Sequence, residues 1–294
     1  MSKVNDVLSN ALTRRNFLVG AGSAAAVSAV GCGGTFMPQT TPVNPPAPQY
    51  TDGDYLNFAL NLEYLEATYY LIATTGTGLS STDTGGTGKV TGGSQVIMTS
   101  AEQAYANEIA QDELNHVRFL RSALGTSAVT MPAVNLVDSF NAAAVAAGVG
   151  ASFNPFASWQ NFLVGAFLFE DVGVTAYRGA APLLTDKGNL GAAAGIMAVE
   201  AYHAALLRTL IIRAGAPYVG WANQFSALRA TLSGGGETIL SSFTIAAADT
   251  TNALAFSRNT NQILSIVYGN AGGNVTSGGF FPSGLNGTIN TTNA

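Results

Sequence analysis

The sequence predicts an all-α fold: a four-helix bundle with one long crossover connection, followed by a C-terminal extension of short helices and turns. Four segments of roughly 22 to 25 residues repeat apolar side chains at helical spacing and are bounded by capping residues, glycine or proline. A connection of roughly 30 residues separates the second segment from the third, as in bundles whose two helix pairs are joined by one crossover.

The first two predicted helices have clear start and stop signals. Asp52 or Asp54 can cap the first helix, which continues until Gly76. Residues 76–98 are rich in Gly, Thr and Ser and predict a surface loop. Overlapping capping boxes start the second helix, which covers residues 99–124.

The other predicted elements follow the same logic, because apolar periodicity defines each helix and Gly or Pro ends it. In chain order they are a connection over 126–156 with a helical turn near 140–147, helices over 158–181 and 190–214, short helices over 221–232 and 260–268, and ordered turns over 278–287. The part after residue 217 carries no motif that indicates a chemistry.

Composition and charge exclude several classes of protein. Charged residues make up 10% of the chain and hydrophobic residues 47%, which is too apolar for a disordered chain. The continuous apolar stretch near the N-terminus is too short for an ordinary membrane-spanning helix. Without residues 1–31 the net charge changes from −5 to −7, because basic residues fall from 12 to 9 and acidic residues from 17 to 16. Such a surface repels phosphate, so nucleic-acid binding is not expected.

The N-terminus resembles a twin-arginine export signal. Arg14 and Arg15 are followed by a polar residue, by Phe17-Leu18 and by an Ala- and Gly-rich apolar run up to Gly31. The resemblance implies export of a protein that has already folded, often around a cofactor. The alternative is a basic N-terminus that precedes a buried helix.

Two interpretations of the end of this signal stay open. Residues 29–32 resemble a lipobox, in which Cys32 becomes the lipidated N-terminus, and ordinary cleavage after Ala29 is the other interpretation. Cys32 is the single cysteine, which excludes an intrachain disulfide and a thiolate metal cluster. Residues 33–50 would form a semi-rigid tether. We therefore expect a periplasmic protein or a membrane-anchored lipoprotein. Its predicted parts are a signal peptide over 1–31, a Gly/Thr/Pro-rich linker over 32–51, the bundle over 52–216 and the extension over 217–294.

Both histidines of the chain occur in the same motif. Glu113 and His116 lie three residues apart in the second predicted helix, and so do Glu200 and His203 in the fourth. Positions i and i+3 share a helix face, so each pair can direct a carboxylate and an imidazole to one point. With 17 acidic residues in 294, chance would place an acid before both histidines about once in three hundred sequences.

The first and third predicted helices each carry a glutamate on the apolar face. Glu63 and Glu170 are each followed seven residues later by a tyrosine, Tyr70 and Tyr177 respectively. Glu66 is the alternative to Glu63, and the shared spacing to tyrosine favours Glu63. The chain therefore has one candidate carboxylate on each of these two helices.

Further matches indicate an internal duplication of a helix pair. The glutamates of the two Glu-x-x-His motifs are each followed by Leu at +7 and by Arg at +8, which are Arg121 and Arg208. Other acids are expected to lie outside the candidate site. Asp171 would point off this face as a surface or helix-pairing residue, and Glu108 and Asp112 would be solvated surface charges.

One Glu from each of two helices and Glu-x-x-His from each of the other two resembles the ligand pattern of the ferritin-like di-iron and di-manganese carboxylate proteins. The resemblance covers about residues 52–214. The chain is similar to the exported, desiccation-related branch of that superfamily, also over 256–287. It implies two Fe or two Mn ions held by Glu63, Glu113, His116, Glu170, Glu200 and His203, with Glu113 and Glu200 bridging. Tyr70 and Tyr177 would be hydrogen-bond donors to these ligands, redox-active groups or simply core aromatics.

The chemistry of the donors agrees with this resemblance. Four carboxylates and two neutral imidazoles balance two divalent ions, and oxygen with nitrogen ligands suits Fe(II) or Mn(II) better than structural zinc. The competing interpretation is that the acids line a solvated face without metal, because burying them unpaired would be very costly.

The function expected from such a centre is redox handling of Fe(II), dioxygen or peroxide, of the ferroxidase or peroxidase type, in protection of the cell envelope. We expect metal ions and dioxygen or peroxide as partners, with a homodimer as one assembly to consider and membrane contact only through a lipid anchor. The alternative is a non-enzymatic structural or desiccation-related envelope protein that keeps the bundle.

Overall fold

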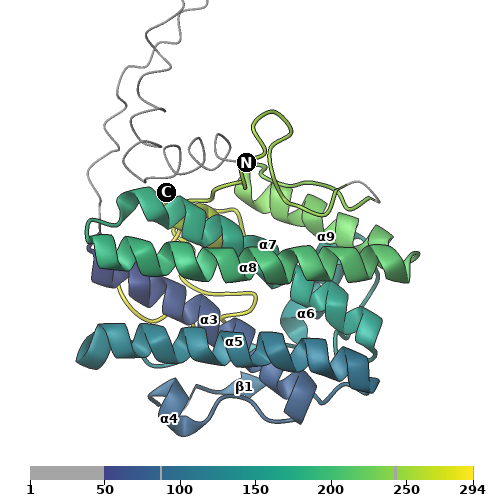
Figure 1. Cartoon of the computed structure of the whole chain (residues 1–294), viewed down its shortest axis with the longest axis horizontal. Helices are drawn as coiled ribbons and strands as arrows, with labels where there is room; N and C mark the ends of the chain where they lie inside the picture. Colours follow the sequence, from purple (N-terminus) through teal and green to yellow (C-terminus); the bar gives the residue numbers. More distant parts are fainter. Residues whose placement is uncertain (1–49, 87, 242–243, 294) are drawn as a thin grey trace, which may run out of the picture. The chain divides into compact units, whose positions relative to one another are not determined.

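The computed structural model describes residues 50–86, 88–241 and 244–293, and these residues confirm the all-α prediction (Figure 1). The four long helices are α3 (Asp52–Thr75), α5 (Ser100–Leu124), α7 (Trp159–Ala180) and α8 (Lys187–Ala214). Helix α3 packs mainly against α5, and α7 mainly against α8. In Figure 1 the α7–α8 pair lies above the α3–α5 pair. The export signal, Cys32 and residues 33–49 of the tether fall outside the described residues.

Side-chain caps set the starts of these helices. Thr51 caps α3, because its hydroxyl accepts from the Asp54 amide while the Asp54 carboxylate accepts from the Thr51 amide, so the cap precedes the residues predicted for it. Helix α5 begins in the same way at Thr99, as predicted. Helix α8 begins three residues earlier than predicted, because Asp186 caps it by accepting from the Asn189 amide.

The connections contain more regular structure than the sequence predicted. The loop after α3 includes helix α4 (Ser81–Thr84) and strand β1 (Val90–Thr91), which pairs in parallel with β2 (Val134–Asn135). The short 3-10 helices η1 (Gly125–Ser127) and η2 (Ala181–Leu183) follow α5 and α7. The crossover also contains α6 (Asp138–Ala147), where a helical turn was predicted.

The C-terminal extension packs on the third and fourth helices of the bundle. Helix α9 (Tyr218–Ser233) contacts α6, α7 and α8, and α10 (Thr260–Val267) contacts α7 and α9. The Arg258 amide donates to the Thr175 carbonyl of α7 at 3.0 Å. Gly179 permits this approach, since a Cβ there would lie 1.9 Å from the Arg258 carbonyl oxygen. The chain therefore crosses α7 in direct backbone contact.

Among the described helices, α8 is long and apolar enough to cross a membrane by length and composition alone. A core helix of a soluble protein meets the same criteria. Here α8 packs along α7, and it carries the buried Glu200 and His203 on its inner face.

Candidate metal centre

The four long helices bring all six predicted ligand residues together in the bundle interior. Each of them is at most 8% exposed: Glu63 on α3, Glu113 and His116 on α5, Glu170 on α7, and Glu200 and His203 on α8. They form two overlapping groups, in each of which the potential ligand atoms lie within 4.8 Å of one another. Glu113 and Glu200 belong to both groups, which is the position a bridging carboxylate requires.

Both imidazoles face the centre through Nδ1. The Nδ1 of His116 lies 3.3 Å from Glu63 Oε2 and 3.5 Å from Glu113 Oε2 and from Glu200 Oε1. The Nδ1 of His203 lies 3.0 Å from Glu113 Oε1 and 3.3 Å from Glu170 Oε2. Glu113 therefore directs one oxygen to each histidine.

Eight buried nitrogen and oxygen atoms of these six residues have no hydrogen-bond partner within the described part of the chain. They are Glu63 Oε2, both carboxylate oxygens of Glu113 and of Glu200, Glu170 Oε2, and the Nδ1 atoms of His116 and His203. Buried polar atoms are almost always satisfied, because leaving one unpaired costs about 1–3 kcal/mol. A set of eight such atoms converging on one volume fits cations held between them, and the buried acids do not line a solvated face.

The same crowding shifts the pKa values of the cluster. Burial raises the pKa of Glu113 to about 7, and burial together with the charges of Glu113 and Glu170 raises the pKa of Glu200 well above its usual value. Burial acts to lower the pKa of both histidines, but the carboxylates of Glu63 and Glu170 outweigh it and raise those pKa values. Protons therefore supply part of the positive charge that the cluster needs in the absence of metal.

Two tyrosines bind the carboxylates of Glu63 and Glu170, which are called terminal here because each belongs to only one of the two groups, in a reciprocal arrangement. Tyr70 of α3 donates to Glu170 Oε1 of α7 at 2.5 Å, and Tyr177 of α7 donates to Glu63 Oε1 of α3. In each glutamate the other oxygen, Oε2, is left facing the centre. Burial and the adjacent carboxylates raise the pKa of both tyrosines well above their usual value, so both remain protonated donors. Each tyrosine therefore orients one predicted ligand.

Asp112 is a functional candidate that the sequence analysis assigned to the solvated surface. Its carboxylate is 39% exposed, yet its Oδ2 lies 3.2 Å from His203 Nε2. With Nδ1 directed to the centre, Nε2–H donates to Asp112, and such contacts orient metal-binding histidines in proteins. Its position next to Glu113 was the available signal, but the contact depends on α8, 91 residues away in the sequence.

Glu66, the alternative ligand on α3, belongs to neither group of potential ligands. It is 4% exposed, and burial, together with the nearby charge of Glu200, raises its pKa well above its usual value. The prediction that favoured Glu63 over Glu66 agrees with this arrangement.

Asp171 points away from the centre, as predicted, and of the two predicted positions, surface or helix-pairing, it takes the second, because it is buried between helices. Its carboxylate accepts from Arg208 of α8 at 2.9 and 2.7 Å, and from Arg229 of α9 at 2.8 Å. The duplicated arginine, Arg121, donates to the hydroxyl of Tyr64 at 2.6 Å. Each arginine thus binds the residue that follows the terminal glutamate of the neighbouring helix.

Comparison with known proteins agrees with this geometry. A family model described as a ferritin-like domain matches residues 51–213. The ferritin-like catalase Nec2 of Nesocodon mauritianus is 27% identical over 266 residues, which cover 81% of this chain and 84% of that protein. The desiccation-related protein PCC13-62 of Craterostigma plantagineum is 28% identical over 169 residues, which cover 55% of this chain and 53% of that protein. The first similarity necessarily continues beyond residue 213.

Proposed function

Since the chain belongs to the ferritin-like domain family, we propose that it is an exported protein whose centre of two Fe or two Mn ions consumes peroxide and so protects the cell envelope. The observation that carries this proposal is the set of eight unpartnered, buried ligand atoms in the bundle interior. The name of the catalase relative favours peroxide over dioxygen or Fe(II) as the main substrate.

In this proposal each residue group has a defined task. Glu63 and His116 would hold one ion and Glu170 and His203 the other, and Glu113 and Glu200, which belong to both groups of potential ligands, would be shared between them. The ions supply redox chemistry, since oxygen and nitrogen donors suit Fe and Mn, which change oxidation state readily.

The protein supplies orientation and charge. Tyr70 and Tyr177 hold the terminal carboxylates, and Asp112 keeps the Nε2 proton on His203 so that Nδ1 is free to bind metal. Burial excludes bulk water and strengthens these interactions. The residues of the centre are thus in place without an ion, and Glu113 and Glu200, whose pKa values burial raises, would have to release their protons on metal binding.

Export is the second part of the proposal. Support comes from the paired Arg14-Arg15 and the apolar run up to Gly31. Export of folded protein would allow the centre to be loaded before transport. Cys32 would then anchor the protein to the membrane if the lipobox is processed.

Metal analysis with a peroxide assay tests the centre. We expect two Fe or Mn ions per chain and metal-dependent consumption of hydrogen peroxide in the wild type, because the six residues form two groups of potential metal ligands. Both should be lost in a Glu113→Ala, His203→Ala double variant. Glu108→Ala, an exposed carboxylate on the same helix α5, is the matched control and should retain them. A folded wild-type bundle that binds no metal would contradict the proposal.

A second candidate is a non-enzymatic, desiccation-related envelope protein with the same bundle. The similarity to the desiccation-related protein of Craterostigma plantagineum favours it over other structural functions. It predicts stoichiometric metal, or none, without peroxide turnover. The assay above therefore separates the two candidates.

A further inference from the structure

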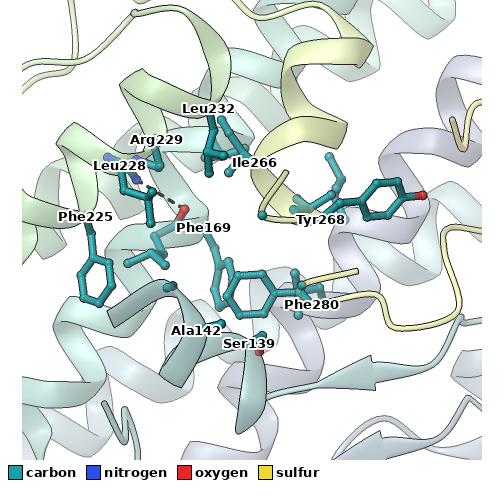
Figure 2. Close-up of a pocket in the computed structure, with 18 of the residues that line it drawn as sticks. Ser139, Ala142, Phe169, Phe225, Leu228, Arg229, Leu232, Ile266, Tyr268 and Phe280 are labelled. Carbon is teal, nitrogen blue, oxygen red and sulfur yellow. Dashed lines mark hydrogen bonds between the residues drawn. The ribbon is translucent and has the colours of Figure 1, made fainter. Parts of the chain in front are cut away.

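An apolar cavity of about 150 Å³ lies beside the candidate metal centre, between the bundle and the C-terminal extension. Its walls come from α3, α6, α7, α9, α10 and the segment near Phe280. In Figure 2, Phe225, Leu232, Ile266 and Phe280 surround the open space, and the hydroxyl of Tyr268 points away from it. The extension, to which the sequence assigned no chemistry, therefore supplies much of the wall.

Few polar side chains line this cavity, and two of them are occupied. Ser139 donates to the Asn135 carbonyl, and both Nη atoms of Arg229 are bonded, to the Phe167 carbonyl, Asp171 and Glu237. The Nε of Arg229 has no partner among the described residues. Glu66 is different: its side chain is buried and makes no hydrogen bond to any described residue. The cavity thus has an apolar body and one carboxyl group, that of Glu66, which is free to bind a ligand.

The inner end of the cavity reaches the candidate centre through a missing side chain. Gly173 lines the cavity, and a Cβ there would lie 2.1 Å from Glu200 Oε2 and 3.5 Å from Glu66 Oε1. Glu200 Oε2 is one of the eight unpartnered atoms. The wall of the cavity at Gly173 therefore lies next to Glu200, a carboxylate that belongs to both groups of potential ligands.

The outer end of the cavity is lined by small residues. Ala142 and Ala146 on α6 and Gly269 after α10 line it and are exposed. Because none of them has a side chain larger than a methyl group, we take the entrance of the cavity to lie between α6 and the end of α10.

We propose that this cavity binds a small organic molecule with an apolar body the size of one aromatic ring and a single hydroxyl or hydroperoxyl end, which lies at Glu66 and faces the candidate centre. Dry apolar cavities of about 150 Å³ accept benzene-sized ligands. Apolar pockets with one placed polar group orient such ligands. As a statement about the substrate of the centre, the inference rests on the proposed function; as a statement about binding, it does not.

Ligand binding to the metal-free full-length protein tests the inference. Benzyl alcohol and toluene serve as probes, and saturable shifts of protein NMR signals give the two dissociation constants. We expect both probes to bind. Ala142→Phe, which narrows the entrance, should raise both dissociation constants by about tenfold or more. Val145→Phe is the matched control, because Val145 is exposed on the same helix and does not line the cavity. It should leave both constants unchanged.

Glu66→Leu tests the polar end. It should weaken the binding of benzyl alcohol and leave the binding of toluene unchanged or tighter, because only the hydroxyl of benzyl alcohol would contact the carboxyl group. Absence of saturable binding to the wild type, or equal effects of Ala142→Phe and Val145→Phe, would overturn the cavity assignment. Equal effects of Glu66→Leu on both probes would overturn the assignment of the polar end. Metal content of the same variants, measured separately, reports on the centre, so failure of one proposal is distinguishable from failure of the other.

Discussion

Glu170 and Asp171 are neighbours on α7, are both fully buried, and belong to two different charged clusters. Glu170 faces the candidate metal centre, where one of its oxygens, Oε2, has no hydrogen-bond partner. Asp171 faces the arginine cluster, defined here as Asp171, Arg208, Arg229, Glu237 and Arg258. Both carboxylates are shielded from solvent, but only that of Asp171 forms ion pairs with arginines.

In the arginine cluster the chain itself supplies the positive charge, since three arginines surround two carboxylates. Arg229 binds Asp171 and Glu237 at 2.8 Å each, and Arg258 binds Glu237 at 2.6 Å. Among the described residues, the buried Nε of Arg229 has no hydrogen-bond partner. The candidate centre instead places four carboxylates around two imidazoles. A buried acidic cluster without arginine or lysine side chains of its own therefore indicates cations supplied from outside, because an unpaired buried charge is very costly.

The largest expected effect is that of Asp171→Asn. It should cost about 3–5 kcal/mol of unfolding free energy, because Arg208 and Arg229 would keep their charge without its counter-charge. The cost should be the same with and without metal. Guanidinium denaturation measures it, and Glu108→Gln, an exposed carboxylate-to-amide change, is the control. A cost below about 1 kcal/mol would mean that the ion pairs of Asp171 contribute no more than solvent-exposed ion pairs do.

The same variant has a defined pH dependence. Burial acts to raise the pKa of Asp171, but Arg229 and Arg208 outweigh it and lower that pKa. The carboxylate therefore contributes its full stability above the unfolded-state pKa of about 3.9, and this contribution is lost as the pH falls through the lower folded value. The difference between wild type and Asp171→Asn should be constant near neutral pH and shrink below about pH 4.

The two clusters also show what the sequence could predict. Both Glu-x-x-His pairs and the Glu-to-Tyr spacings are local helical patterns, so the sequence located Glu170 and Tyr177 in the site. The partners of Asp171 are not local: Arg208 is 37 residues away and Arg229 is 58 residues away, on a helix of the extension. Such contacts depend on how helices pack, which periodicity does not specify.

The early start of α8 was missed for a related reason. Gly188 and Gly191 lower the helix propensity of its first turn, and the cap at Asp186 outweighs them in the structure. The parallel pairing of β1 with β2 joins residues on either side of α5, so no local signal announces it. Local chemistry is therefore predictable here, whereas the packing of the connections and of the extension is not.

A smaller effect is expected at the tyrosines, and it would sharpen the contrast. Tyr70→Phe removes the hydrogen bond to Glu170 and Tyr177→Phe the one to Glu63. Each should therefore lower the affinity for one of the two ions by about 10–100-fold. Stepwise metal titration followed by calorimetry should show one weakened site in each variant. Tyr105→Phe, a change at an exposed position of α5, is the control. Unaltered titrations in both variants would reduce Tyr70 and Tyr177 to core aromatics.

The smallest expected effect has the opposite sign from Asp171→Asn. In the metal-free protein, Glu200→Gln should stabilise the fold by about 1–2 kcal/mol, because it removes a buried acid that has no fixed counter-charge. The raised pKa of Glu200 means that the folded protein binds a proton that the unfolded chain releases above about pH 4.3, so wild-type stability falls as the pH rises beyond that value. The gain from Glu200→Gln should therefore grow from pH 5 to pH 8, as measured by guanidinium denaturation. After loading with Fe(II) or Mn(II) the sign should reverse, since the amide cannot bridge two ions as a carboxylate does. If Glu200→Gln instead destabilises the metal-free protein as Asp171→Asn does, the two clusters are alike, and the unpartnered atoms no longer indicate a metal centre.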